Sequence, residues 1–135
     1  MKPVFVDSNI PMYVAGRDHP HREPARRLLA RARAGEIGAC TSTEVLQEIL
    51  YRYAGLRRLD LAREVYDLFV QLCLKVFPVT LADTDRAKEL ACSGAGIGVR
   101  DAIHAAVMIN NDVPEIATFD GGFDRIHGIE RLRLD

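Results

Sequence analysis

Residues 3–10 read Pro-Val-Phe-Val-Asp-Ser-Asn-Ile, and this stretch decides which fold we expect. Three apolar, strand-favouring residues run directly into Asp7. So short a continuous apolar run is typical of a strand that is buried on both faces. Asp7 then stands at the carboxyl end of the strand, where open α/β sheets place their ligand sites. An ionised carboxylate is costly to bury there unless a cation or hydrogen-bond donors meet it.

Strands and helices alternate along the rest of the chain. Residues 11–16 suggest a short helical turn, and Asp18–His21 open a helix that ends at Gly35. We expect further strands at 37–40, 76–79, 115–118 and 131–134, helices at 43–55, 60–75, 80–93 and 99–110, and a turn or short helix at 119–124. This alternation predicts an α/β fold, a three-layer α/β/α sandwich around a central, mainly parallel sheet.

Two of the expected helices form a hairpin. They cover residues 43–55 and 60–75 and are joined by a short link. The second helix has a wider apolar face than one contact with a core needs. Part of this face is therefore a candidate surface for binding a partner.

Length and composition favour one soluble domain that covers residues 1–135. The net charge of −1 gives no basic excess that would indicate nucleic acid, although a local patch can lie within a balanced total. Cys40, Cys73 and Cys92 fit no metal-binding spacing, and we expect small core residues in a reducing cytosol. Met1 is followed almost at once by a strand, and no apolar run could span a membrane, so we expect no signal peptide and a cytoplasmic location.

Several acidic residues stand where chemistry is expected, but each also has an ordinary explanation. Asp120 follows an apolar strand, as Asp7 does, yet it could simply begin the turn before two glycines. Asp101 lies in the first turn of a helix that is apolar nearly all round, where it could interact with the helix amino terminus. Glu48 could form an exposed i,i+4 pair with Arg52.

Taken together, these carboxylates predict a metal site. If they were packed into one pocket, they would repel one another and their pKa values would rise unless divalent cations neutralised them. Oxygen ligands suit Mg²⁺ or Mn²⁺, and no set of cysteines and histidines competes to hold zinc. Such ions can lower the pKa of a bound water and stabilise a phosphoryl group under in-line attack.

Four motifs, in this order, make the chain resemble the PIN-domain nucleases, and among them the VapC toxins of VapBC toxin–antitoxin modules. They are V-D-S-N at 6–9, T-S-T-E-V-L-Q-E at 41–48, R-D-A-I-H-A-A at 100–106 and T-F-D-G-G-F-D at 118–124. The likeness runs from Val4 to about Leu132, which is nearly the whole chain.

The resemblance implies a metal-dependent endoribonuclease, the toxin of a toxin–antitoxin module, that hydrolyses RNA phosphodiester bonds through a metal-activated water. The implied cofactor is Mg²⁺, with Mn²⁺ as the other option. By position, the resemblance assigns the catalytic metal site to Asp7, Glu48, Asp101 and Asp120. The choice of Glu48 over Glu44 follows from the family spacing alone. The implied supporting residues are Asn9, Thr118 and Asp124, and the candidate RNA contacts include Arg52 and Arg100.

The resemblance also implies partners. These are a cognate VapB antitoxin, which would wrap the helical hairpin at about 43–75 and occlude the acidic pocket, and a second copy of the chain in a homodimer. For His104, one turn beyond Asp101, packing or hydrogen bonding is the expected role.

Other functions stay open to different degrees. A haloacid-dehalogenase-like phosphatase also needs an aspartate after its first strand, but it needs a second one where this chain has Asn9. A receiver-like pocket needs paired acids and a late lysine, and no lysine follows residue 88. A housekeeping RNA-processing PIN nuclease and a catalytically silent PIN-fold binding module both fit the sequence. A small antitoxin gene next to this one would favour the toxin over the housekeeping enzyme.

Overall fold

The computed structural model describes all residues, 1–135, and confirms the expected α/β sandwich. A five-stranded sheet has the order β3-β2-β1-β4-β5, and every neighbouring pair is parallel. The strands are β1 (Lys2–Val6), β2 (Ile37–Ser42), β3 (Lys75–Phe77), β4 (Glu115–Ala117) and β5 (Glu130–Arg131). The helices are α1 (Asn9–Ala15), α2 (Arg22–Arg33), α3 (Thr43–Gly55), α4 (Leu59–Leu72), α5 (Leu81–Ala91), α6 (Val99–Asn110) and the 3₁₀ helix η1 (Gly121–Arg125).

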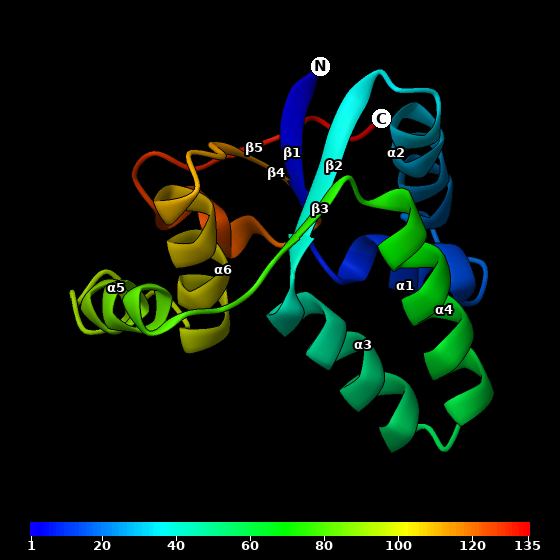
Figure 1. Ribbon diagram of the computed structural model, residues 1–135, viewed down its shortest axis with the longest axis horizontal. Coiled ribbons are helices and arrows are strands. Elements are labelled where there is room, and N and C mark those ends of the chain that lie inside the picture. The colour runs from blue at the N-terminus through cyan, green and yellow to red at the C-terminus, as the bar shows by residue number, and fades with distance from the viewer.

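Helices cover both sides of the sheet (Figure 1). α1, α2 and α4 pack against one another on one side, and α5 pairs with α6 on the other. β2 is buried along its whole length, and the last three residues of β1 are fully buried. The short continuous apolar run at the start of the chain is thus a strand covered on both faces, as its pattern predicted.

The strand order reverses direction next to β1. The chain moves outward from β1 through β2 to β3, and then returns to the other side of β1 for β4 and β5. The switch point therefore lies between β1 and β4. In open α/β sheets, ligands bind beyond the carboxyl ends of the strands at such a point. Asp7 follows β1 and Thr118 follows β4, so both stand at this crevice.

Local sequence explains where several helices begin. The Ser42 hydroxyl accepts a hydrogen bond from the Val45 N–H (3.4 Å) and caps α3. Thr80 and Asp83, three residues apart, form a reciprocal capping box at the start of α5. β3, with Pro78 directly after it, is an edge strand, and proline is found at the ends and edges of sheets because it cannot donate a backbone hydrogen bond.

Several helix boundaries differ from the prediction, most clearly those of α2 and α4. Residues 18–21 are not helical: a bend at Asp18 leads to a turn at Pro20 and His21, and α2 begins only at Arg22. α4 begins at Leu59 and ends at Leu72, so Asp60 lies inside its first turn and does not cap it. The predicted extension to Lys75 was wrong because that residue begins β3, where it pairs with Cys40 of β2.

The cysteines do not all lie in the core. Cys40 is buried and Cys73 is half-buried, but Cys92 is exposed beyond the end of α5. The prediction of three core cysteines was therefore wrong for Cys92. No disulfide joins the three thiols, and burial raises the pKa of Cys40 to about 11.

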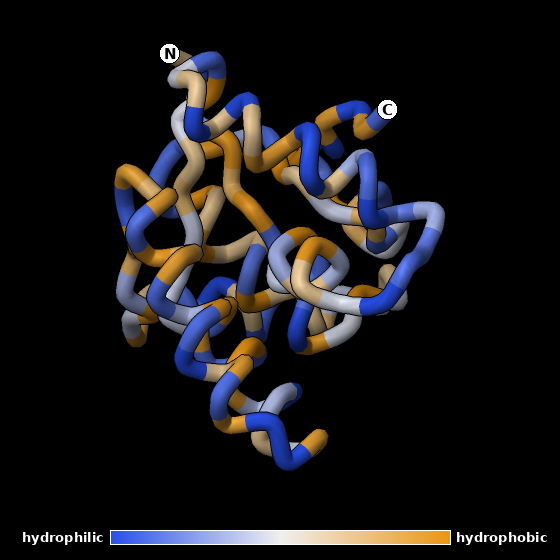
Figure 2. Tube along the Cα trace, turned by 90° about the vertical axis from the view of Figure 1, so that its right-hand side faces the viewer, coloured by the Kyte–Doolittle hydropathy of each residue, from blue (hydrophilic) through white to orange (hydrophobic).

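The hairpin of α3 and α4 projects from the body of the molecule (Figure 1). In Figure 2, hydrophobic segments alternate with hydrophilic ones along this hairpin. Its exposed large apolar side chains include Tyr51 (77% exposed), Leu59 (70%) and Leu68 (58%). No helix in the molecule has both the length and the apolar character needed to cross a membrane.

Candidate metal centre

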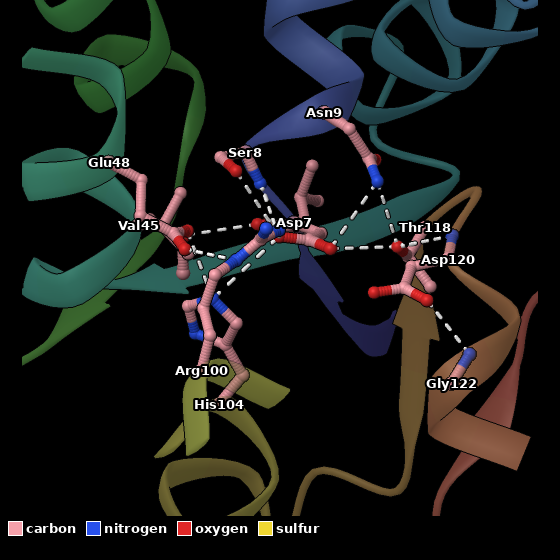
Figure 3. A network of polar contacts seen from close by, with 12 residues as sticks. Asp7, Ser8, Asn9, Val45, Glu48, Arg100, His104, Thr118, Asp120 and Gly122 are labelled. Atoms are coloured by element: carbon pink, nitrogen blue, oxygen red, sulfur yellow. Dashed lines mark hydrogen bonds and ion pairs between the residues drawn. The ribbon is translucent and has the colours of Figure 1, made fainter. Parts of the chain in front are cut away.

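Asp7 is fully buried at the carboxyl end of β1, and donors surround its carboxylate (Figure 3). Its Oδ1 accepts the Ser8 N–H at 2.7 Å, and its Oδ2 accepts the Thr118 hydroxyl at 2.7 Å. The Asn9 amide lies 3.5 Å from Oδ2. These contacts supply the donors that a buried carboxylate requires, and they fix its orientation.

Thr118 connects β4 to the end of β1 through its hydroxyl group. While donating to Asp7, the hydroxyl oxygen also accepts the Asn9 amide at 3.1 Å and the Asp120 N–H at 3.0 Å. One buried oxygen thus contacts three residues, which come from the end of β1, the start of α1 and the segment after β4. Asn9 and Thr118, two of the three supporting residues that the family resemblance implied, lie where they can orient Asp7 and the start of the Asp120 segment.

Glu48 projects from α3 toward α6. Its Oε1 lies 3.0 Å from Nε2 of the fully buried His104, and its Oε2 forms an ion pair with Nε of Arg100 without hydrogen-bond geometry. Burial opposes ionisation of Glu48, but the hydrogen bond from His104 and the charges of His104 and Arg100 outweigh it and lower the pKa. Glu44 has no such partner, and its pKa is raised by burial and by Glu48.

His104 contacts the acidic residues mainly through its hydrogen bond with Glu48. Burial lowers the pKa of this histidine, but the hydrogen bond with Glu48 and the negative charges of Asp7 and Glu48 outweigh burial and raise it. Its Nε2 lies 3.8 Å from Oδ1 of Asp7, so the ring stands between two carboxylates. The expectation that His104 packs and hydrogen-bonds is confirmed: its ring is 5.7 Å from that of Phe5.

Arg100 is the cation that faces the acidic residues. Besides its ion pair with Glu48, its Nη2 lies 3.8 Å from Oδ1 of Asp7. Burial would lower the pKa of the guanidinium, but the charges of Glu48, Asp7, Asp101 and Asp120 together raise it. All four predicted acidic residues therefore lie within electrostatic reach of one positive group. Its side chain is 53% exposed, so it is not locked in this position.

Asp101 and Asp120 form a pair of like charges beside this group. Burial and the neighbouring Asp120 raise the pKa of Asp101 to about 6, while Arg100 opposes the rise only in part. Asp120 is held by the Gly122 N–H, which donates to its Oδ1 at 2.8 Å. This repulsion, which helps to raise the pKa of Asp101, favours binding of a cation between the two carboxylates.

Gly122 is a site residue that sequence reasoning missed. A Cβ atom at this position would lie 2.7 Å from Oδ2 of Asp101 and 3.1 Å from Oδ1 of Asp120. The glycine therefore leaves the space that the two carboxylates occupy. The only signal in the sequence was the pair of glycines after Asp120, which indicates a turn as readily as a close approach.

We expect Gly122→Ala to slow the RNA cleavage that the family resemblance implies by about 10-fold or more, since small displacements of groups at a reacting centre lower the rate strongly. The carboxylate of Asp101 would have to shift, but no core packing is lost, so the thermal unfolding temperature should change little. Gly121→Ala is the matched control, because a Cβ there has no neighbour closer than 3.9 Å. Equal activity of the two variants would show that the Asp101–Asp120 geometry does not matter.

The donor set fits a divalent cation. Ligand atoms of Asp7, Glu48 and His104 all lie within 4.8 Å of one another, and Asp101 and Asp120 contribute further oxygens nearby. Nε2 is the His104 nitrogen that lies next to Asp7 and Glu48, and it is engaged by Glu48. The ligand atoms left at this point are carboxylate oxygens, which suit Mg²⁺ or Mn²⁺. A cation that contacted Asp7 and Glu48 would take the place of the Arg100 guanidinium.

The structure does not bring Asp124 to these carboxylates. Both of its oxygens bind Arg131, at 2.9 and 2.8 Å, on the exposed surface. The hydrogen bonds from Arg131 lower the pKa of Asp124, so this acid already has its cation. The supporting role that the family resemblance implied for Asp124 has no contact behind it in this structure, because Arg131 holds both of its oxygens.

A groove of about 1150 Å³ opens beside the acidic cluster. Ser8, Asn9, Glu48, Arg100 and Asp120 line it, whereas the buried Asp7 does not. The other lining residues come from the end of α1, the turn that follows it, and α3 with its link to α4; they include Tyr13, Arg17, His19, Tyr51, Arg52 and Leu56. The groove thus leads from the carboxylates past aromatic and basic side chains.

Comparison with known proteins gives one family and one fold. The family model for the PIN domain matches residues 4–129. Ribonuclease VapC13 of Mycobacterium tuberculosis is 39% identical over 129 residues, which cover 96% of this chain and 98% of that protein. The solved structure of VapBC2 from Rickettsia felis, bound to a DNA fragment from its promoter, superposes with a TM-score of 0.74 at 19% identity, covering 98% of this chain and 99% of that one. M. tuberculosis VapC20, described as a sarcin–ricin loop cleaving toxin, has a TM-score of 0.74 at 22% identity, covering 90% and 92%.

Proposed function

The chain belongs to the PIN domain family, and we propose that it is a cytoplasmic, metal-dependent endoribonuclease, the toxin of a toxin–antitoxin module. Cleavage of RNA agrees with the name of its ribonuclease relative, which it matches over nearly its whole length. The observation that supports this function best is that four carboxylates gather around the Arg100 guanidinium, at the switch point of a parallel sheet. The matched family and the relatives reported above support neither a phosphatase nor a receiver.

The metal ligands that we propose are Asp7, Glu48, Asp101 and Asp120. When bound, Mg²⁺ or Mn²⁺ would supply a water of lowered pKa and positive charge beside the phosphate group. The chain itself holds the ligands in place. Thr118 and Asn9 orient Asp7 from one side, and His104 orients Glu48 from the other. Such outer contacts fix the direction of carboxylate oxygens before a cation arrives.

We propose that Arg100 changes partner during the reaction cycle. In the metal-free protein it balances Glu48 and Asp7. Since it lines the groove and is about half exposed, it can turn away and pair with an RNA phosphate. Arg52, which lines the same groove, is a second candidate for a phosphate contact.

The hairpin of α3 and α4, within residues 43–75, is the surface that we propose for protein partners. It carries exposed leucines and Tyr51, and its inner side forms one wall of the groove. An antitoxin of the VapB kind bound there would cover both the apolar residues and the entrance to the acidic cluster. The solved VapBC2 complex shares the fold of this chain. A homodimer is the second assembly that we propose for the exposed apolar surface.

The function is tested by incubating purified, antitoxin-free protein with structured RNAs. We expect cleavage in Mg²⁺ or Mn²⁺, none in chelator, and recovery when the cation is restored. Asp120→Asn should lose the activity, and Asp67→Asn, a change at an exposed aspartate of α4 without an ion pair, should keep it. Equal cleavage by wild type and Asp120→Asn would assign the activity to a contaminant. Cleavage that continues in chelator would contradict metal dependence.

A further inference from the structure

Four aromatic rings gather beside the acidic cluster and take no part in the contacts described so far. We call Tyr13, His19, His21 and Phe119 the aromatic cluster. His21 stacks on Phe119 with ring centroids 4.0 Å apart and an interplanar angle of 10°. Tyr13 lies 4.6 Å from His19 and meets both members of the stack edge-on, at 5.1 and 5.3 Å.

The chain attaches this cluster directly to the candidate metal centre. Phe119 stands between Thr118, which binds Asp7, and Asp120. Tyr13 follows Asn9 by four residues in α1, so the two share one face of the helix and lie about 6 Å apart along its axis. Tyr13 is therefore about one helical turn from Asn9, whose amide reaches the Asp7 carboxylate.

The rings are held in place, but they are not sealed in the core. The His21 N–H donates to Nδ1 of His19 at 3.0 Å, which fixes the orientation of the His19 ring. Tyr13 and His19 line the large groove, while His21 and Phe119 stand behind them and line a smaller groove. His19 is exposed, and the other three side chains are half-buried. A ring positioned in this way presents an aromatic face to solvent at low entropic cost.

Positive charge lies near these rings. Arg17 and Arg52 line the same groove, and neither forms an ion pair within the chain. Free guanidinium groups beside an exposed aromatic face match a phosphate backbone and an unstacked base, which is how proteins hold single-stranded nucleic acid. A paired base could not use this surface, because its faces are covered within the helical stack.

We propose that the aromatic cluster is a base-stacking subsite, which holds one unpaired RNA nucleobase on Tyr13 and His19 while Arg17 and Arg52 contact the neighbouring phosphates. The proposal rests on the ribonuclease function, since it names how the same groove recognises RNA. It makes single-stranded segments, such as loops, the substrates that can reach the carboxylates. Stacking tolerates every base, so the subsite selects unpaired structure more than sequence.

The test measures binding without cleavage. A short oligoribonucleotide that contains 2-aminopurine is titrated in chelator, and an otherwise identical oligoribonucleotide with an abasic position is titrated beside it. We expect stacking on the cluster to quench the aminopurine fluorescence. His19→Ala and Tyr13→Leu should weaken binding by between about 5- and 100-fold. Tyr13→Phe should bind as wild type does, because it keeps the ring.

His127→Ala is the matched control, because His127 is an exposed histidine that lines neither groove. The abasic oligonucleotide should bind equally weakly to wild type and to His19→Ala. His19→Ala removes no buried side chain, so its result stands even if Tyr13→Leu is poorly folded. Binding by His19→Ala within twofold of wild type, or no binding of the oligoribonucleotide by wild type, would overturn the subsite. Metal-dependent cleavage of structured RNA, measured separately, would still support the nuclease.

Discussion

Asp101→Asn protein should cleave RNA more than about 100-fold more slowly than wild type and yet be more stable when divalent cations are absent. The loss of activity follows from the loss of a proposed metal ligand, since even partners outside the ligand shell commonly change metal-site activity by 10- to 100-fold. The gain in stability follows from the pair of like charges. In wild type, burial and the neighbouring charge of Asp120 together raise the pKa of Asp101 to about 6. An amide at position 101 carries no charge and no longer repels Asp120.

The size of this stability difference depends on pH. The pKa of Asp101 is about 6 in the folded chain and near 3.8 in a free carboxyl group, so the folded state binds more protons between these values. The favourable contribution of protonated Asp101 to the free energy of unfolding is complete below about pH 4 and is lost as the pH rises through about 6. Two pKa units correspond to about 3 kcal/mol. Because the side chain is partly exposed, we discount this to about 1 kcal/mol in free energy of unfolding.

Denaturant unfolding in chelator, near pH 4 and near neutral pH, measures this difference. We expect Asp101→Asn to exceed wild type near neutral pH and to match it in acid. Added Mn²⁺ should stabilise wild type and leave the variant unchanged. The control is Asp67→Asn, which should follow wild type throughout. If chelated Asp101→Asn is less stable than wild type near neutral pH, the carboxylate pair is not repulsive.

Asp7→Asn protein should be equally inactive, but its stability should change in the opposite direction. The Asp7 carboxylate is fully buried and already accepts the Ser8 N–H and the Thr118 hydroxyl. An amide group would turn a donor toward one of these donors and remove the charge that faces Arg100 and His104. Losing acceptor and charge in a buried network costs about 2–4 kcal/mol.

Urea unfolding of Asp7→Asn in chelator, beside Asp101→Asn, tests the contrast between the two acids. Both variants lose one carboxyl group of the same site, so each serves as the control for the other. We expect a lower midpoint for Asp7→Asn and a higher one for Asp101→Asn, with equal slopes. An unchanged midpoint for Asp7→Asn would mean that its hydrogen-bonded environment does not stabilise the fold.

The sequence was most informative where a residue's environment depends on its immediate neighbours. The run before Asp7 predicted a strand buried on both faces, and β1 is such a strand. The apolar character of residues 99–110 predicted the buried helix α6. The capping box at Thr80 depends on a spacing of three residues and could be predicted outright.

The sequence was less informative where two distant segments meet. The helical period puts Arg100 and His104 on one face of α6, but only packing against α3 shows that they meet Glu48 and not Glu44. Polar residues misled the prediction at the end of β2. Thr41 is fully buried because its hydroxyl donates to the Val6 carbonyl at 3.0 Å, so the strand runs beyond Cys40 to Ser42. The close approach of Gly122 to Asp101 likewise depends on how η1 packs beside α6.

Binding of Mn²⁺, followed by electron paramagnetic resonance of the free ion, tests the proposed metal centre most directly. The titration uses wild type, Asp67→Asn and Asp101→Asn near neutral pH, without RNA. We expect wild type and Asp67→Asn to remove Mn²⁺ from the free pool and Asp101→Asn to leave it free. Binding by Asp101→Asn as tight as that of wild type, or no binding by wild type, would contradict a metal site made by these carboxylates.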